Sequence, residues 1–265
     1  MFNIDIQYTW LLLFLPLVVA AFDWFLLTKR PDVAALTSTF SCLATFVLSL
    51  GLLDRTGSDS FSWLPISDIF SVDLGFVLDP LSSQMMLVVT GIGLLVHVFS
   101  LAYMADDKAK TRYFACLSLF MFSMTGIVLA NNIAMTFIFW ELVGLSSYLL
   151  IGHWYTRDTA ANAAKKAFIC NRVGDFGFLI GILTLWALTN TLDFSLMEIP
   201  AGISENLLNI TVLCLFCGAV GKSAQFPLHV WLPDAMEGPT PVSALSHAAT
   251  MVAAGVYMMV RVQYS

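Results

Sequence analysis

The residues best able to do chemistry are ionisable side chains inside long apolar segments. Lys222 lies near the end of one apolar run, shortly before Pro227, and Glu141 lies at the centre of another, FIFWELVGLSSYLL. Charged groups at membrane depth cost free energy, and membrane proteins keep them mainly along ion pathways and at coupling sites. These two positions therefore predict ion-transfer chemistry.

Lys222 is the expected counter-ion of Glu141. A buried lysine without a counter-ion tends to release its proton, whereas a paired lysine keeps its charge. Making and breaking this pair would act as a switch for one proton. The structural alternative is a static salt bridge that only fixes how the helices pack.

Four further charges, Lys165, Lys166, Arg172 and Asp175, fall in one apolar segment, residues 160–188. Arg172 and Asp175 are three residues apart, and Lys165 and Arg172 are seven apart, so we expect Lys165, Arg172 and Asp175 on one helix face that avoids lipid. The functional hypothesis is a proton path along this face. The alternative is a structural stripe of ion pairs, and Lys165 and Lys166 could instead extend to the membrane surface.

His247 lies in the last apolar run, one turn after Ser243 and three residues before Thr250. Histidine titrates near neutrality and can relay protons. The alternative is a core histidine that only satisfies its own hydrogen bonds. His97 and Asp23 have no comparable polar companions, and we expect them to be structural.

The composition predicts an integral membrane protein. Hydrophobic residues make up 58% of the chain and charged residues 11%, against about 25% charged residues in soluble domains. Repeated apolar runs predict an all-α polytopic membrane protein with about eight transmembrane helices, each long enough to cross about 30 Å of hydrocarbon. The net charge of -6 and the lack of a basic cluster exclude a nucleic-acid partner.

The apolar runs divide the chain into three parts. We expect two transmembrane helices in 1–53, an extramembrane connection in 54–79, and six transmembrane helices in 80–265. Within the connection, FSVDLGFVLD predicts a hairpin. The expected spans are 8–27, 33–53, 81–104, 112–130, 133–151, 160–188, one starting near 207, and 241–261.

The seventh span contains Pro227, which removes a backbone donor and clashes with the carbonyl of Ser223. We therefore predict a discontinuous helix broken just after Lys222. The first span is expected to be retained, because it is too long for a signal peptide. Lysines and arginines gather in the connections after odd-numbered spans, which predicts an outer N-terminus with those connections inside.

Cofactor chemistry is not expected in this chain. It has no phosphate-binding glycine loop and no nucleophile elbow. Cys214 and Cys217 form a C-x-x-C without a second ligand pair, and the four histidines lie on different segments. We expect neither a cofactor nor a metal.

The motifs FIFWELVGLSSYLLIGHWY and AAKKAFICNRVGDFGFLIGIL resemble the L-type antiporter-like membrane subunits of respiratory complex I. The resemblance implies antiporter-like half-channels with a broken helix, related by inverted repeats. It implies that Glu141 and Lys222 form the switching pair, that Arg172 and Asp175 are the charges of the sixth span, and that His247 leads toward a central hydrophilic axis.

The resemblance also implies the function and partners. We expect a proton-translocating subunit of NADH:quinone oxidoreductase with no redox centre of its own, surrounded by lipid and by other membrane subunits. The expected location is a bacterial cytoplasmic membrane or the mitochondrial inner membrane. Two alternatives are a subunit of a multisubunit Na⁺/H⁺ antiporter, which shares these motifs, and a non-transporting membrane scaffold.

One departure from the family is expected to matter. The family's subunits carry a second broken helix with its own lysine and a long lateral helix, and this chain ends before them. We therefore expect a fragment, or a split gene product, that contains most of one half-channel.

Overall fold

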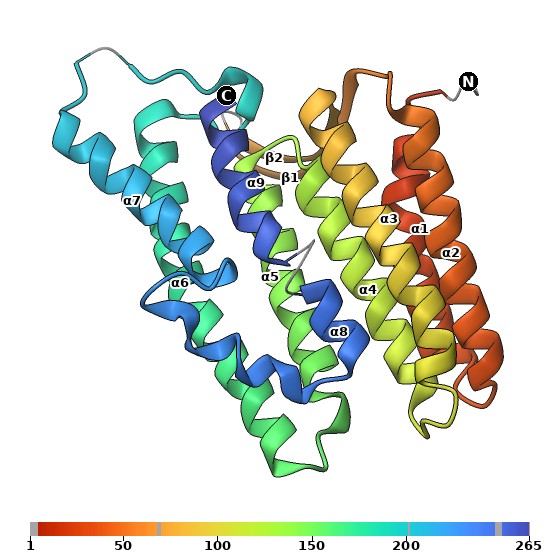
Figure 1. Ribbon diagram of the computed structural model, residues 1–265. Helices are drawn as coiled ribbons and strands as arrows, with labels where there is room; N and C mark the ends of the chain where they lie inside the picture. Colours follow the sequence, from red (N-terminus) through yellow and green to blue (C-terminus); the bar gives the residue numbers. More distant parts are fainter. Residues whose placement is uncertain (1–4, 68–69, 201, 247–250, 265) are drawn as a thin grey trace.

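The computed structural model describes residues 5–67, 70–200, 202–246 and 251–264, and these are mostly helical (Figure 1). The α-helices are α1 (Tyr8–Leu26), α2 (Pro31–Leu52), α3 (Pro80–Tyr103), α4 (Lys110–Leu129), α5 (Ile133–Ile151), α6 (Asp158–Thr189), α7 (Glu205–Lys222), α8 (Thr240–Ala244) and α9 (Met251–Tyr264). Short 3₁₀ helices are η1 (Gly152–Trp154), η2 (Phe194–Leu196), η3 (Leu228–Trp231) and η4 (Asp234–Glu237), and the strands are β1 (Gly57–Ser67) and β2 (Phe70–Leu78).

Seven helices, α1 to α7, are long and apolar enough to cross a membrane in the described part of the chain. The prediction of a helical polytopic membrane protein is therefore confirmed. Of the eighth expected span, 241–261, the structure describes 241–246 and 251–261, which contain the end of α8 and most of α9. The described residues thus contain seven full-length spans rather than eight.

Helix α4 is the centre of the N-terminal bundle. It contacts α1, α2, α3 and α5, and almost all of its residues are buried. A helix that is apolar on every side belongs inside a bundle, which explains why α4 lies between the others. Helix α5 connects this bundle to α6 and α7, which lie on the opposite side of the molecule in Figure 1.

The connection between α2 and α3 forms the predicted antiparallel hairpin, in which Gly57 of β1 faces Leu78 of β2. Side-chain hydrogen bonds fix the hairpin to the helices. Asn132 Nδ2 donates to the Asp73 carbonyl at 2.7 Å, and Trp10 Nε1 donates to Asp59 at 2.9 Å. Its location outside the bilayer stays a prediction.

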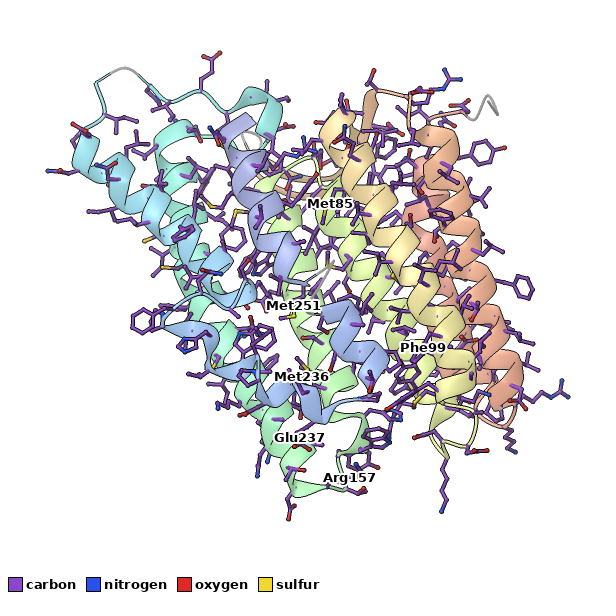
Figure 2. All side chains as sticks on the ribbon, viewed as in Figure 1. Met85, Phe99, Arg157, Met236, Glu237 and Met251 are labelled. Atoms are coloured by element: carbon purple, nitrogen blue, oxygen red, sulfur yellow. The ribbon has the colours of Figure 1, made fainter. Side chains whose placement is uncertain are left out.

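The connections α1–α2, α3–α4 and α5–α6 gather at one end of the bundle (Figure 1). Arg157, in the α5–α6 connection, lies at that end (Figure 2), opposite the end where both termini lie. This arrangement agrees with the expectation that the connections after odd-numbered spans lie on the same side of the membrane. Which end faces the inside stays a prediction.

Candidate ion-transfer site

The predicted helix break after Lys222 is confirmed. Helix α7 ends at Lys222, and Ala224 follows with a left-handed φ of 48°. Two carbonyls in the last turn of α7, which lack a partner within the helix, accept hydrogen bonds from residues after it. Gln225 N donates to Val220 O at 2.9 Å, and Trp231 Nε1 donates to Gly221 O at 3.1 Å. These hydrogen bonds stabilise the break, which places Lys222 at a helix end within the bundle.

Glycines bring α6 and α7 into close contact. A Cβ added at Gly174 of α6 would lie 2.7 Å from the Cys217 carbonyl oxygen and 3.0 Å from Gly221 Cα. A Cβ added at Gly218 of α7 would lie 2.8 Å from Phe178 Cβ. Small residues let transmembrane backbones approach, so the end of α7 packs directly against the middle of α6.

Lys222 and Asp175 face each other across this interface. Lys222 Nζ lies 3.8 Å from Asp175 Oδ2, and the side chains are 0% and 3% exposed. Trp140 of α5 donates from Nε1 to Asp175 Oδ1 at 2.6 Å. Gly144 of α5 leaves room for the ammonium, since a Cβ there would lie 2.9 Å from Nζ. Two buried charges of this kind are stable only while each has the other nearby.

Glu141 and Arg172 form a second ion pair, which is partly open to the surface. The exposed fractions of their side chains are 21% and 48%. The pair lines a lateral groove of about 430 Å³ between α5 and α6. The Arg172 guanidinium also lies 4.9 Å from the centre of the Phe168 ring. Arg172 is therefore held in place although half of its side chain is uncovered.

The expectation that Lys222 pairs directly with Glu141 is wrong for this structure. Helix α7 packs closely on α6, which gives Lys222 an acid from α6, Asp175, as its ion-pair partner. Glu141 lines the lateral groove instead and pairs with Arg172. Sequence spacing indicates the face of one helix but not which neighbouring helix supplies the partner.

The expectation of one shared face on α6 is also wrong. Asp175 is buried between α5 and α7, Arg172 lines the lateral groove, and Lys165 lines a different cavity. Residues three apart differ by about 60° around a helix axis, which is enough to put Asp175 inside and Arg172 at the groove.

Glu141, Arg172, Asp175 and Lys222 nevertheless form one electrostatic group, here called the charge quartet. Each of the two acids interacts electrostatically with both bases. The formal charges of the quartet sum to zero. In a low-dielectric interior these interactions are strong, so a change in protonation at one member alters the energies of the other three.

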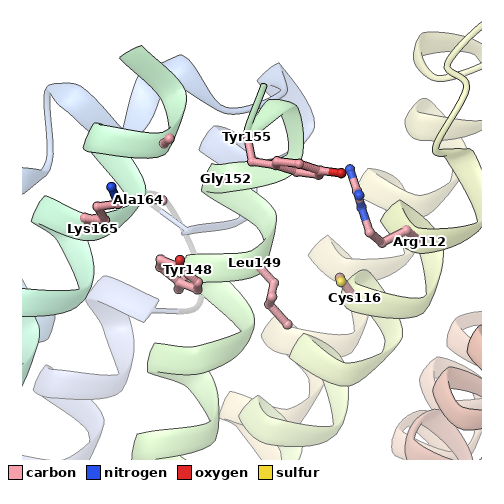
Figure 3. Close-up of a pocket in the computed structure, with 9 residues that line it drawn as sticks. Arg112, Cys116, Tyr148, Leu149, Gly152, Tyr155, Ala164 and Lys165 are labelled. Atoms are coloured by element: carbon pink, nitrogen blue, oxygen red, sulfur yellow. The ribbon is translucent and has the colours of Figure 1, made fainter. Parts of the chain in front are cut away.

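The remaining predicted residues lie outside the quartet. Lys165 lines a cavity of about 230 Å³ with Arg112 and Tyr155 (Figure 3). Lys166 pairs with Asp234 of η4 at 2.6 Å. His247 lies outside the described residues, so its role stays a prediction.

Sequence reasoning missed Trp140 and Gly144. Trp140 is fully buried, and a buried tryptophan needs an acceptor for its N–H group. Its position beside Glu141 in FWELVG was the available signal. Gly144 gave no such signal, because its role is to leave space for Lys222 Nζ, which belongs to another helix.

Comparisons with known proteins give two family matches and a set of similar relatives. Residues 130–264 match the family described as NADH:quinone oxidoreductase/Mrp antiporter, TM, and residues 63–114 match NADH-Ubiquinone oxidoreductase (complex I), chain 5 N-terminus. Similar relatives are the chloroplastic NAD(P)H-quinone oxidoreductase subunits 5 of Zygnema circumcarinatum, 46% identical, and Acorus calamus, 47% identical. The alignments cover 96% of this chain and 39% and 37% of the relatives.

A solved structure is similar along most of the chain. It is that of the Mrp complex from Dietzia sp. DQ12-45-1b, with a TM-score of 0.85 and 28% identity over 94% of this chain and 27% of the other. The chain thus spans well under half the length of the proteins it matches.

Proposed function

Since the chain belongs to the NADH:quinone oxidoreductase/Mrp antiporter transmembrane family, we propose that it forms part of a proton-translocating membrane subunit of an NAD(P)H:quinone oxidoreductase. The naming of the relatives as NAD(P)H-quinone oxidoreductase subunit 5 supports this proposal. In the proposal, redox chemistry elsewhere in the complex supplies the energy, and this chain supplies a path for protons without a redox centre of its own.

One observation carries the proposal, namely the fully buried Lys222 at a helix end, 3.8 Å from Asp175. A lysine ammonium in the membrane interior is costly unless a carboxylate lies nearby. Moving that carboxylate away favours release of the lysine proton, and its return favours uptake. The pair is therefore suited to gaining and losing one proton per cycle.

The energies involved are large enough for pumping. Moving one proton against about 150 mV costs about 3.5 kcal/mol. Breaking a buried ion pair by removing one partner costs about 3–5 kcal/mol. Separation of Lys222 from its counter-ion therefore destabilises the protonated lysine by about as much free energy as one transfer requires, which is enough to make the lysine release its proton.

The proposed cycle uses the whole charge quartet. Lys222 is held by Asp175 in this structure, while Glu141 is held by Arg172 and still interacts with Lys222 electrostatically. A shift of Glu141 between Arg172 and Lys222 would change the proton affinity of the lysine. Entry of the proton from the inner side, past Lys165 and His247, to load Lys222 remains part of the proposal.

The lateral groove supports a partner in the membrane. Arg172 is about half exposed there, at a depth where an uncovered charge is costly. We propose that another membrane subunit of the complex covers Arg172 and Glu141. The two expected locations, the bacterial cytoplasmic membrane and the mitochondrial inner membrane, stay predictions, and the relatives are named as chloroplast proteins.

A multisubunit Na⁺/H⁺ antiporter is the second candidate, favoured by the similarity to the Mrp complex. The test measures proton uptake into vesicles that contain the complete complex. Uptake driven by NAD(P)H and quinone, without a sodium gradient, supports the oxidoreductase. Uptake driven only by a sodium gradient supports the antiporter. No uptake under either condition, in an assembled complex, supports the scaffold alternative.

A further inference from the structure

A cavity of about 230 Å³ lies where α4, α5 and α6 meet near the Arg157 end of the bundle (Figure 3). We propose that this cavity binds a membrane lipid with a net negative headgroup. The lipid phosphate would contact Arg112, Lys165 would add positive charge on the other side of the cavity, and the glycerol and upper acyl chain would lie against the apolar wall. This site is separate from the charge quartet.

Two cations line the cavity without an acid among its lining residues. Within the described part of the chain, neither Arg112 nor Lys165 forms an ion pair. The neighbouring lysines differ, since Lys110 pairs with Asp32 and Lys166 pairs with Asp234. The cavity therefore carries uncompensated positive charge that an anionic group would neutralise.

Arg112 is held in position to receive such a group. One terminal nitrogen donates to the His153 carbonyl at 2.7 Å, and the guanidinium lies 4.9 Å from the centre of the Tyr155 ring. A guanidinium has five N–H donors, so most remain for a ligand after this contact. A fixed, planar arginine is well suited to phosphate because it can donate two parallel hydrogen bonds.

The wall of the cavity indicates a lipid rather than free phosphate. Leu149, Ala161 and Cys116 give it an apolar surface. Inorganic phosphate makes no favourable contact with such a surface, whereas the glycerol and acyl chain of a lipid do. Arg112 lies about 3 Å and Lys165 about 10 Å along the axes from the starts of their helices. The lysine side chain can extend back toward the membrane surface, so both charges reach the level of lipid headgroups. Basic pockets between transmembrane helices bind anionic headgroups in the same way.

The test uses the complete complex and a phosphatidylglycerol that carries a photoreactive group on its acyl chain. After irradiation, labelled peptides are mapped by mass spectrometry. We expect labelling of the peptides that contain Leu149 and Ala161. Unlabelled phosphatidylglycerol should compete at concentrations about tenfold below those of phosphatidylcholine, because the choline ammonium cancels the net negative charge that two basic residues attract at about 1 kcal/mol each.

Arg112→Gln should reduce this labelling about tenfold, the effect of losing one charge-assisted hydrogen bond. Arg157→Gln is the matched control, because Arg157 stacks on Trp154 at 4.7 Å and does not line the cavity. Its labelling should equal that of the unchanged protein. If Arg112→Gln does not assemble, Lys165→Gln replaces it, with an expected loss of about fivefold, because Lys165 contributes positive charge without a direct contact.

Four results would overturn the proposal. Equal competition by phosphatidylcholine would indicate ordinary surrounding lipid. Displacement by inorganic phosphate alone would indicate a free-anion site. Equal labelling of the Arg112→Gln and Arg157→Gln complexes would show that Arg112 does not hold the lipid. Absence of label from the wall peptides would indicate that a protein partner covers the cavity.

Discussion

Lys222 of α7 and Asp175 of α6 lie 3.8 Å apart, Nζ to Oδ2, and both side chains are buried. Asp175 also accepts a hydrogen bond from Trp140 of α5 at 2.6 Å. The carboxylate therefore connects the end of a broken helix to two continuous helices. In our proposal, any motion among these three helices alters the proton affinity of Lys222.

Asp175→Asn tests this relationship. Asparagine keeps the size of the side chain and an acceptor for Trp140, but it leaves Lys222 without its nearest negative charge. A loss of about 3 kcal/mol at a buried pair corresponds to a roughly hundredfold loss of coupled proton uptake. Trp140→Phe is the control, since it removes one hydrogen bond to the carboxylate, worth about 1.5–3 kcal/mol, and leaves the Asp175 charge beside Lys222. Equal pumping by the two variants would contradict the role given to the Asp175 charge.

Gly174→Ala tests the close contact between α6 and α7. The added methyl group would lie 2.7 Å from the Cys217 carbonyl oxygen, so the helices must separate. We expect a destabilisation of about 1–3 kcal/mol, measured as a lower midpoint of denaturant unfolding of the assembled complex.

Gly91→Ala on α3 is the control for that experiment. A Cβ at Gly91 would meet only the ring of Phe46, at 3.2 Å, and the ring can shift. We expect little change in the unfolding midpoint. If both alanine variants behave alike, close approach of α6 and α7 does not explain the presence of Gly174.

The sequence was sufficient to predict the helix break and the burial of Lys222 within the bundle. Pro227 ends the helix path after Lys222, and Glu141 lies at the centre of an apolar run. It was not sufficient to predict that Lys222 pairs with Asp175. That choice depends on the separation of α6 and α7, which glycines such as Gly174 determine through packing across the helices. Periodicity within one helix carries no such information.

The structural role expected for Asp23 did not depend on how the helices of the charged site pack. It was expected to be structural, and it accepts a hydrogen bond from Thr37 Oγ1 at 2.6 Å between α1 and α2. By contrast, the contacts of Asp107 with His153 and Trp154 were not predicted. They join two connections that lie far apart in the sequence, and no local pattern marks such a contact.

Asp79→Asn separates two roles of one residue. Asp79 is the N-cap of α3, where it accepts a hydrogen bond from Ser82 N at 2.7 Å, and it also pairs with Arg261 of α9. Asparagine is as good an N-cap as aspartate but removes the ion pair. We expect faster amide hydrogen exchange in α9 and unchanged exchange in the first turn of α3.

Asp79→Ala removes both roles and is the comparison for that experiment. Loss of the N-cap should cost about 1 kcal/mol and add faster exchange at the start of α3. If Asp79→Asn affects α3 as strongly as Asp79→Ala does, the separation of the cap from the ion pair is wrong.

The pKa of Asp107 predicts acid sensitivity of the α3–α4 connection. Burial acts to raise this pKa, but hydrogen bonds from Trp154, Ala109 N and His153 outweigh it, so the pKa lies below its usual value. A lowered carboxyl pKa contributes stability that is fully present above the unfolded value of about 4. That stability is lost as the pH falls through the lower folded value.

Thermal unfolding of the complex with and without Asp107→Asn measures this effect. The unchanged protein should be the more stable one, by a constant margin above about pH 4. The margin should shrink at lower pH as Asp107 takes up a proton. A margin that stays constant or widens on acidification would contradict the lowered pKa.

The central claim is that Lys222 exchanges a proton in each cycle, and redox-driven proton uptake by reconstituted vesicles tests it most directly. The measurement compares the intact complex with Lys222→Ala and with Glu141→Gln, after assembly of each complex has been verified. We predict that Lys222→Ala abolishes uptake and that Glu141→Gln strongly reduces it. Full uptake by an assembled Lys222→Ala complex would contradict the claim and leave the charge quartet a structural feature.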